Sequence, residues 1–235
     1  MSDSTRTFDH VKRQLLSNRC TDTKERNQFY DSWAENYRKD VAVLGYNGPT
    51  LAANCLLTHF AGSREAALVL DVACGTGLVA EAMSELGFRH FVGVDGSKGM
   101  LEQAAETGLY QDLRPALLGT QPLPAQADMF DVVMIVGGLR VGIVPVSAVR
   151  ELCNATKPGG LVCMTRGDFM MGPVYSAYKA DLERELQLME EEGLWTQVED
   201  IKTDKYLKNV YQEGDMADMR DGEYMSASIY LYRKL

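Results

Sequence analysis

The sequence predicts an α/β fold, in which a mostly parallel sheet has helices on both faces, and three observations predict it. Largely apolar runs at 67–71, 91–95 and 130–136 are typical of strands that are covered on both faces. Segments with helical spacing of apolar residues separate these runs, and strands that alternate with helices form parallel sheets through right-handed crossovers. A chain of 235 residues is long enough for one such domain with a full core.

Helices are predicted to form most of the first 62 residues, after a frayed tail at 1–7. Phe8, Val11 and Leu15 have the spacing of one face of a short helix. The segment 22–25 resembles an N-terminal capping arrangement, and a helix with clustered aromatic residues follows it. Pro49 stands at the first position of a third helix. We interpret 1–62 as an N-terminal helical lid that belongs to the same domain as the core at 63–235.

The core is predicted to continue the alternation to the end of the chain. Further strands are predicted at 114–118 and 161–165, with a closing hairpin-like pair at 198–206 and 226–232. The helices between the strands are predicted at 78–86, from Ser97 onward, at 145–156 and at 175–193. Ser97 is suited to cap its helix, and Gly87 is a typical left-handed terminator of the helix before it.

The net charge and the cysteine pattern limit the possible functions. The net charge of −9 and the pI of about 4.9 argue against DNA or long RNA as the acceptor, because proteins bind free nucleic acid by neutralising its phosphates. The five cysteines are scattered without a C-x-x-C pair, which predicts reduced thiols and no metal site. The sequence has neither an 18-residue apolar run nor a secretory signal in its first nine residues. We therefore expect no membrane partner and a cytoplasmic or, alternatively, nuclear location; a monomer is favoured.

The stretch 66–77, AALVLDVACGTG, organises the rest of the chain. Its strand runs into a tight loop in which Gly75 and Gly77 allow a ligand to approach the backbone, since no Cβ stands in the way. The helix that starts near Leu78 directs its N-terminal N–H groups at the same place. This combination predicts a nucleotide-type cofactor site at the carboxyl end of a parallel strand.

Two carboxylates indicate which cofactor binds. The loop also fits the dinucleotide pattern G-x-G-x-x-A, which alone is weak evidence. Asp71 closes the strand before the loop, where a pyrophosphate would be repelled and a cationic amine attracted. Asp95 ends the next strand, about 20 residues on, where an acid takes ribose hydroxyls. Acids at both strand ends suit S-adenosylmethionine, which has an ammonium group and a ribose but no phosphate.

These motifs resemble those of the class I S-adenosylmethionine-dependent methyltransferases. The resemblance rests on Asp71-Val-Ala-Cys-Gly-Thr-Gly77, on Gly93-Val-Asp95-Gly-Ser97 and on Met100, and it covers roughly 29–168. The segments 29–34, 94–104 and 156–163 also suggest a narrower match, to one methyltransferase-like protein of this family. The resemblance implies a Rossmann-like fold with a seven-stranded, mostly parallel sheet and an antiparallel edge strand.

The resemblance also implies cofactor-binding roles. Asp71 is expected to face the methionyl ammonium, through the loop or a water, or else only to hold the loop amides. The loop residues expected to line the methionyl and ribose parts are Ala73, Cys74, Gly75 and Gly77. Asp95 is expected to take both ribose hydroxyls, and Gly96 and Met100 to flank the adenine. Cys74 is expected to be a small filler rather than a reactive thiol.

Five further residues complete the candidate cofactor site. Gly119 stands where the family usually has an acid for the adenine amino group, so backbone groups around 118–120, Gly119 and Thr120 included, are expected to hold the base instead. Tyr30 and Tyr37, seven residues apart on one helix face, resemble the cofactor-covering segment of related enzymes; they could equally be core aromatics. Val136, at the end of the strand 130–136, is the last cofactor-binding candidate.

The methyl acceptor is not determined by the sequence. Arg140, after the strand 130–136, could receive an anionic acceptor, although a surface position is the commoner fate of an arginine. Asp168 could be a base or a structural turn residue, and His10 is expected at the surface. Tyr175, Met170 and Met171 could wall a pocket or simply pack. The region of the methionines at 216, 219 and 225 is expected to be a loop near the pocket mouth and is assigned no role. No N-P-P-Y run is present, which disfavours adenine or glutamine N-methylation of the kind that uses it.

The function predicted from the sequence is methyl transfer from S-adenosylmethionine, with S-adenosylhomocysteine as the product. The acceptor is expected to be a small molecule or a protein rather than nucleic acid, and no catalytic residue is assigned, because positioning alone can supply most of the barrier reduction. Two alternatives stay open. One is a non-enzymatic S-adenosylmethionine-binding regulatory module, and the other is a nicotinamide-dependent oxidoreductase.

Overall fold

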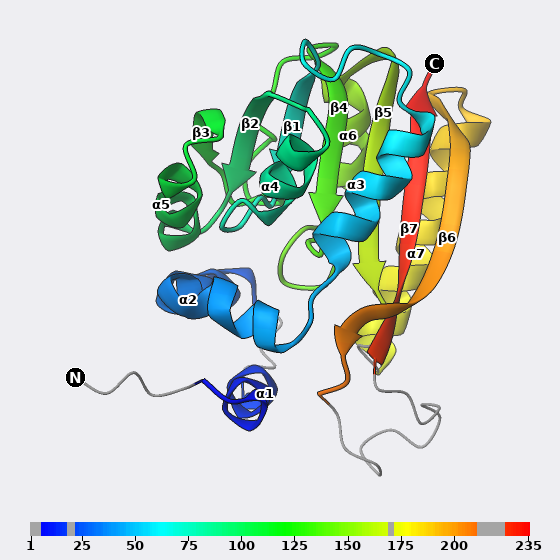
Figure 1. The fold of residues 1–235 in the computed structure, drawn as a ribbon. Coiled ribbons are helices and arrows are strands. Elements are labelled where there is room, and N and C mark those ends of the chain that lie inside the picture. The colour runs from blue at the N-terminus through cyan, green and yellow to red at the C-terminus, as the bar shows by residue number, and fades with distance from the viewer. Residues whose placement is uncertain (1–5, 18–21, 169–171, 211–223) are drawn as a thin grey trace.

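A computed structural model describes residues 6–17, 22–168, 172–210 and 224–235 (Figure 1). The described part contains one seven-stranded sheet with the strand order β3-β2-β1-β4-β5-β7-β6. The strands are β1 (Leu68–Val72), β2 (His90–Asp95), β3 (Tyr110–Pro115), β4 (Phe130–Val136), β5 (Thr156–Gly167), β6 (Trp195–Lys208) and β7 (Tyr224–Lys234). The Rossmann-like fold predicted from the sequence is confirmed.

Strand directions follow the predicted pattern. The strands β1 to β5 pair in parallel, whereas β7 pairs antiparallel with both β5 and β6. The antiparallel strand therefore lies one place inside the edge, and the outermost strand β6 runs in the same direction as the parallel set. The closing pair predicted at 198–206 and 226–232 corresponds to β6 and β7.

The third strand begins earlier than the sequence predicts. The prediction placed it at 114–118, but β3 spans Tyr110–Pro115. This strand is the edge of the sheet and most of it is at least partly exposed, so it has no apolar run to reveal it. The apolar residues that suggested a strand, Ala116 and Leu118, are buried directly after it, in the segment that leads towards β4.

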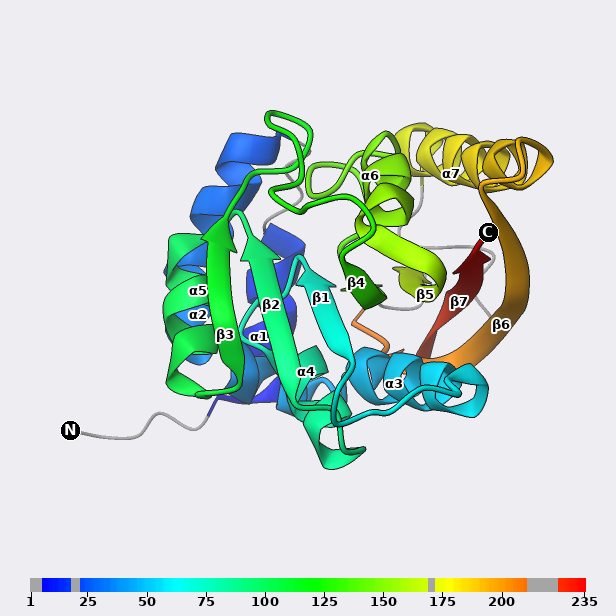
Figure 2. The ribbon, with the colours of Figure 1, turned by 90° about the horizontal axis from the view of Figure 1, so that it is seen from above.

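Helices cover both faces of the sheet (Figure 2). One core lies under α3 (Gly48–His59) and α4 (Leu78–Glu85), and includes Leu56 and Met83. The other lies under α6 (Ala148–Ala155) and α7 (Pro173–Glu191), and includes Leu152 and Leu186. The alternating burial of β4, which contributes Val132 to the first core and Val133 to the second, explains why its sequence is apolar throughout.

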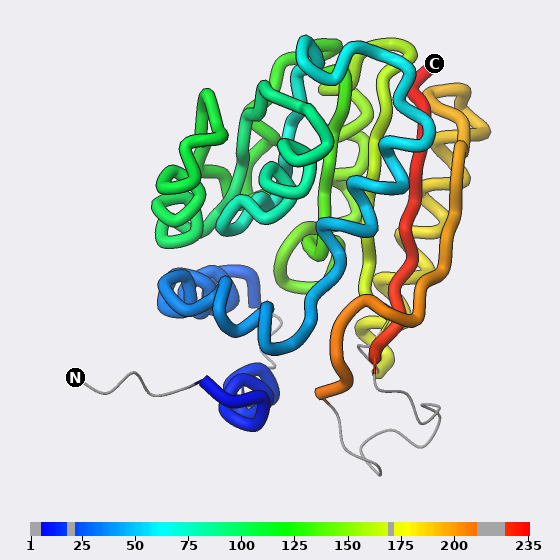
Figure 3. Tube along the Cα trace, in the orientation of Figure 1, coloured from blue at the N-terminus to red at the C-terminus, as the bar shows by residue number. Residues whose placement is uncertain are grey.

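The N-terminal helices occupy two places. α3 packs on the sheet, whereas α1 (Phe8–Ser17) and α2 (Thr23–Val43) lie across the carboxyl ends of the strands (Figure 1). α2 begins as the sequence predicts, because the Asp22 side chain accepts hydrogen bonds from the amides of Lys24 and Glu25, each at 3.0 Å. Its far end is held by β6: the Lys208 amide donates to the Leu44 carbonyl at 2.8 Å, where β6 reaches the N-terminal helices (Figure 3). None of the described helices is long and apolar enough to cross a membrane.

Contacts with α5 (Lys98–Glu106) hold α2 in place. The Asp31 carboxylate accepts hydrogen bonds from the Ser97 hydroxyl at 2.6 Å and from the Gly99 amide at 3.0 Å. Gly99 lets the two helices approach closely, because a Cβ at this position would lie 2.9 Å from the Asp31 carbonyl oxygen and 3.1 Å from the Ala34 Cβ. The N-cap Ser97 and Gly99, at the start of α5, thus serve as the docking point for α2.

Replacing Gly99 with alanine is expected to destabilise the protein. Helix propensity alone would favour alanine by up to about 1 kcal/mol. The contact with backbone atoms of α2 reverses this sign, and we expect a loss of about 1–3 kcal/mol in the free energy of unfolding. Urea denaturation measures the effect, with Lys98→Ala, at an exposed neighbouring position, as the control. A stabilised Gly99→Ala variant would show that the two helices do not pack as described.

Candidate cofactor and acceptor site

A cavity of about 210 Å³ lies between α2 and the carboxyl ends of β1, β2 and β4. A single buried water needs only about 10–15 Å³ of such space, so the cavity suits a larger molecule. Eight of the predicted site residues line it: Tyr30, Tyr37, Ala73, Gly75, Asp95, Gly96, Met100 and Val136. Five others, Asp71, Cys74, Gly77, Gly119 and Thr120, do not.

The loop between β1 and α4 has the backbone that its glycines predict. Gly75 and Gly77 have φ angles of +55° and +90°, and Ala73 has +53°. The Cys74 amide donates to the Val94 carbonyl at 3.1 Å, which ties the loop to the end of β2. A Cβ on Gly75 would meet no protein atom within 4 Å, and Gly75 lines the cavity. The side of the loop that faces the cavity is therefore open to a ligand.

Asp95 is fixed at the end of β2 by two backbone amides. One carboxylate oxygen accepts from the Gly75 amide and the other from the Ser97 amide, both at 2.8 Å. Burial raises the pKa of this carboxyl, while hydrogen bonds from the two amides oppose the rise. Asp95 also lines the cavity, so the positioned carboxylate can accept hydrogen bonds from hydroxyls there.

Asp71 lies behind the glycine loop and is fully buried. One carboxylate oxygen accepts from the Tyr110 hydroxyl at 2.7 Å, and the other has no hydrogen-bond partner among the described residues. The buried Thr76 hydroxyl also has no hydrogen-bond partner among the described residues. Unpaired buried polar atoms are rare, and they mark places where a ligand or water completes the structure. A cationic amine at the loop, held directly or through a water, would satisfy the free oxygen of Asp71, so these residues fit S-adenosylmethionine.

The pKa of Asp71 predicts a pH-dependent stability. Burial raises this pKa to about 7, although the Tyr110 hydrogen bond opposes the rise. Because the folded-state pKa lies above the unfolded one, Asp71 favours folding fully below about pH 4, and this contribution is lost as the pH rises towards 7. In the ligand-free protein, Asp71→Asn is expected to gain about 2 kcal/mol over the wild type between pH 5 and pH 7.

Urea denaturation of the two proteins at several pH values measures this difference, in which the titration of other groups cancels. The asparagine keeps an oxygen that can accept the Tyr110 hydrogen bond, so packing should change little. A stability difference that stays constant from pH 5 to pH 7 would contradict a raised pKa at Asp71.

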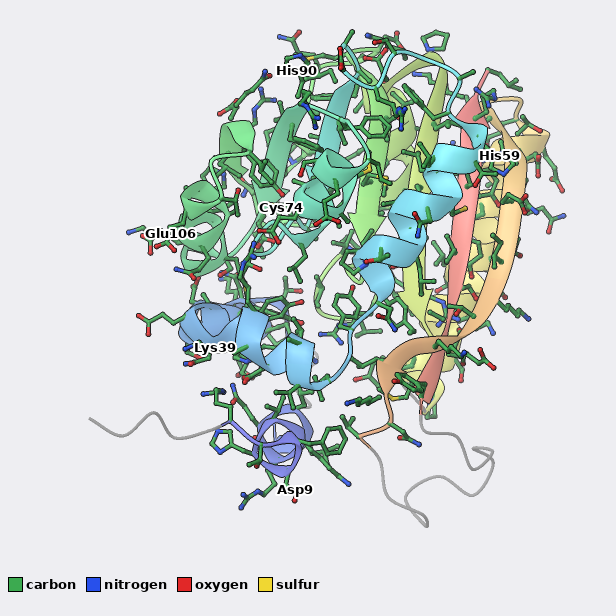
Figure 4. All side chains as sticks on the ribbon, viewed as in Figure 1. Asp9, Lys39, His59, Cys74, His90 and Glu106 are labelled. Carbon is green, nitrogen blue, oxygen red and sulfur yellow. The ribbon has the colours of Figure 1, made fainter. Side chains whose placement is uncertain are left out.

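The other four predicted residues that do not line the cavity are either packed against protein atoms or exposed. Cys74 is a buried residue of the loop (labelled in Figure 4), and burial raises the pKa of its thiol, which agrees with a filler role. A Cβ on Gly77 would lie 3.1 Å from the Tyr110 ring. Gly119 and Thr120 are exposed, and the residues that face the cavity here precede them: Ala116, Leu117 and Leu118.

The sequence analysis favoured a surface position for Arg140, and the structure corrects this expectation. It is half-buried and lines the cavity, where one guanidinium N–H donates to the Tyr30 oxygen at 2.5 Å. Tyr46 and Tyr206, which the sequence did not single out, line the same cavity, and their hydroxyls lie 3.2 Å apart. No local pattern could reveal these neighbours, because they come from segments far apart in the chain.

Asp168 and His10, two of the remaining candidates, do not line the cavity. Asp168 is paired with Arg166 and accepts from the Ser228 hydroxyl at 3.0 Å, which is a structural arrangement. His10 is exposed, and neither it nor His59 and His90, which Figure 4 shows away from Cys74 and the loop, lines the cavity. Met225 is buried against α1 and faces the cavity. The methionines at 170, 171, 216 and 219 lie outside the described residues.

Comparison with known proteins decides the family. Residues 69–160 match the family described as "Methyltransferase domain". Methyltransferase-like protein 27 of Homo sapiens is 48% identical over 174 residues, which span 74% of this chain and 69% of that protein. This chain belongs to the class I S-adenosylmethionine-dependent methyltransferases. The same relative confirms the narrower resemblance, to the Williams–Beuren-syndrome-region methyltransferase-like protein. That resemblance was suggested by the segments 29–34, 94–104 and 156–163.

Other similarities are shorter or more distant. An 18S rRNA (guanine-N(7))-methyltransferase of Arabidopsis thaliana is 39% identical over 89 residues, which span 38% of this chain and 27% of that enzyme. The crystal structure of the cyclase SpnF superposes with a TM-score of 0.65 at 17% identity, over 91% of this chain and 97% of that one. The second likeness shows the fold alone. Neither determines the acceptor, because acceptor sites vary independently of the fold.

Proposed function

We propose that this methyltransferase binds S-adenosylmethionine in the cavity under α2 and methylates a small molecule that enters the same cavity, rather than nucleic acid. The observation that supports this most directly is the geometry of Asp95, whose carboxylate is fixed by the Gly75 and Ser97 amides and faces the cavity. When bound, the cofactor supplies a sulfonium methyl group, which passes to an acceptor lone pair while the electrons of the broken carbon–sulfur bond stay on sulfur.

Each part of the cofactor has residues suited to hold it. Asp95 would accept hydrogen bonds from the two ribose hydroxyls. The open face of Gly75 would contact the methionyl part of the cofactor. The unpaired oxygen of Asp71 would balance the positive charge of the methionyl ammonium group, through the loop or a water. The adenine base would lie among residues that directly follow β2 and β3 or belong to α5: Gly96, Met100, Ala116, Leu117 and Leu118.

Catalysis is proposed to depend on positioning. Among the described residues that line the cavity, Asp95 is the only carboxylate, and no histidine is present. The tyrosines are poor bases at neutral pH, because desolvation raises the pKa values of Tyr37, Tyr46 and Tyr206 above the usual range. The acceptor atom must therefore be nucleophilic without help from these groups, and alignment can contribute up to about 7–11 kcal/mol of barrier reduction.

An acceptor of small size agrees with the position of α2 over the site. α2 crosses the strand ends and is fastened at both sides, by Asp31 to α5 and by Arg38, whose guanidinium donates to the Thr76 carbonyl at 2.6 Å. The net charge of −9 also disfavours a long nucleic acid. The similarity to the rRNA enzyme covers 38% of the chain and carries no information on the remainder.

The test is calorimetric titration with S-adenosylmethionine, S-adenosylhomocysteine and NADH, followed by an acceptor screen with a labelled methyl donor. We expect micromolar binding of the first two ligands, no binding of NADH, and label transfer to a small-molecule fraction. Binding without transfer to any fraction would favour the regulatory-module alternative. Folded protein that binds neither sulfur ligand would overturn the proposal.

A further inference from the structure

We propose that the methyl acceptor carries a carboxylate group and that Arg140 binds it. The inference rests on the proposed function and adds the chemical class of the acceptor. It starts from an unusual feature of the cavity: a half-buried guanidinium that faces a ligand-sized space without an acidic partner among the described residues.

The guanidinium of Arg140 is only partly satisfied. It has five N–H donors and stays protonated in proteins. Among the described residues it donates one side-chain hydrogen bond, to the Tyr30 oxygen, and its Nε is buried without a partner. It forms no ion pair within the described ranges, whereas Arg150 and Arg166 each have a carboxylate partner there. A buried charge left in this condition is costly, which indicates that an anion completes the site.

Tyrosines surround the charge without neutralising it. Tyr30, Tyr37, Tyr46 and Tyr206 all line the cavity with Arg140. The Tyr206 hydroxyl lies 3.1 Å from the Thr165 hydroxyl and 3.2 Å from the Tyr46 hydroxyl, so the three hydroxyls form a hydrogen-bonded chain. Neutral tyrosine hydroxyls can donate to an anion beside the guanidinium, and their rings, with Leu139 and Ile143, provide an apolar surface for the rest of a small acceptor.

A carboxylate fits this site better than a more highly charged group. The planar guanidinium fork matches the two oxygens of a carboxylate, which can accept parallel hydrogen bonds. The cavity also contains the Asp95 carboxylate, which would repel a phosphate dianion more strongly than a monoanion. Arg140 contributes one positive charge beside neutral tyrosine donors, and a monoanion matches it. A second guanidinium, that of the buried Arg26, lines the same cavity.

The cofactor's own carboxylate is a less suitable occupant. The loop at 73–77, which would hold the methionyl part, is contacted from α2 by a different guanidinium, that of Arg38 at the Thr76 carbonyl. Arg140 comes instead from the segment after β4, where its guanidinium contacts Tyr30 on α2. The experiment below separates the two possibilities, because it measures cofactor and acceptor binding independently.

The test measures binding of three acids to protein loaded with S-adenosylhomocysteine: benzoate, phenylacetate and 3-phenylpropanoate, each compared with its primary amide. The amides have the same shape and no charge. Titrations up to about 10 mM detect dissociation constants near 1 mM. At least one acid is expected to bind about tenfold or more tightly than its amide, since hydrogen bonds to charged groups are the stronger ones.

The variants Arg140→Gln and Arg140→Lys locate the effect, and Arg114→Gln, on β3 and outside the cavity lining, is the matched control. Arg140→Gln should abolish the preference for the acid, Arg140→Lys should retain part of it, and both should bind S-adenosylhomocysteine within about threefold of the wild type. No acid binding, equal binding of acids and amides by the wild type, or an acid preference that survives in Arg140→Gln would overturn the inference.

The failures of the two proposals differ. If the wild type does not bind S-adenosylhomocysteine, the proposed function fails and the acid titrations are not reached. If the wild type binds it but Arg140→Gln loses this binding while staying folded, Arg140 holds the cofactor and the acceptor inference is overturned. The comparison of acids with amides in the wild type remains decisive even if a variant does not fold.

Discussion

Replacing Asp95 with alanine is expected to weaken binding of S-adenosylhomocysteine at least about 100-fold. In the proposed complex this carboxylate accepts hydrogen bonds from both ribose hydroxyls, and hydrogen bonds to charged groups contribute about 1.5–3 kcal/mol each. Two such bonds correspond to two or more decades in the dissociation constant. The variant also loses the acceptors of the Gly75 and Ser97 amides, which orient the loop and the start of α5. Calorimetric titration measures the loss.

Two measurements make the Asp95 result specific. Asp112→Ala removes a partly exposed carboxylate of β3, paired with Arg114, and is expected to bind the cofactor as the wild type does. Thermal unfolding of Asp95→Ala checks that the protein is folded at the temperature of titration. A folded variant whose affinity falls less than about tenfold would contradict the assignment of Asp95 to the ribose.

Replacing Gly75 with alanine is expected to weaken cofactor binding roughly 10- to 100-fold while the protein stays folded. The added Cβ would meet no protein atom within 4 Å and would enter the space proposed for the ligand. Overpacking of this kind costs about 1–3 kcal/mol, here in the complex rather than in the free protein. The free protein loses only about 1–2 kcal/mol, because alanine is disfavoured at a φ of +55°.

Gly108→Ala is the matched control for Gly75→Ala. Gly108 has a φ of +67° and also has open space at its Cβ position, but it lies after α5 and does not line the cavity. It should therefore show a similar loss of stability and an unchanged affinity for S-adenosylhomocysteine. If both variants bind the cofactor equally well, the ligand does not lie against Gly75.

Much of the fold follows from local sequence signals. β4 was predicted with its observed bounds, because a strand between two cores must be apolar on both faces. The glycine loop could be recognised because Gly75 and Gly77 adopt left-handed backbone conformations that other residues disfavour. The edge strand β3 was misplaced for the opposite reason, since half-exposed residues leave no apolar pattern.

The sequence by itself determined the methyltransferase class and the expected positions of Asp71, Gly75 and Asp95, because a short motif carries both the turn and its charges. Only the tertiary structure decided what faces the acceptor. Arg140 lies 110 residues from Tyr30, and Tyr46 lies 160 residues from Tyr206, yet each pair is in hydrogen-bond contact. Such contacts depend on how α2, β4 and β6 meet at one end of the sheet, and no spacing within a single segment encodes that meeting.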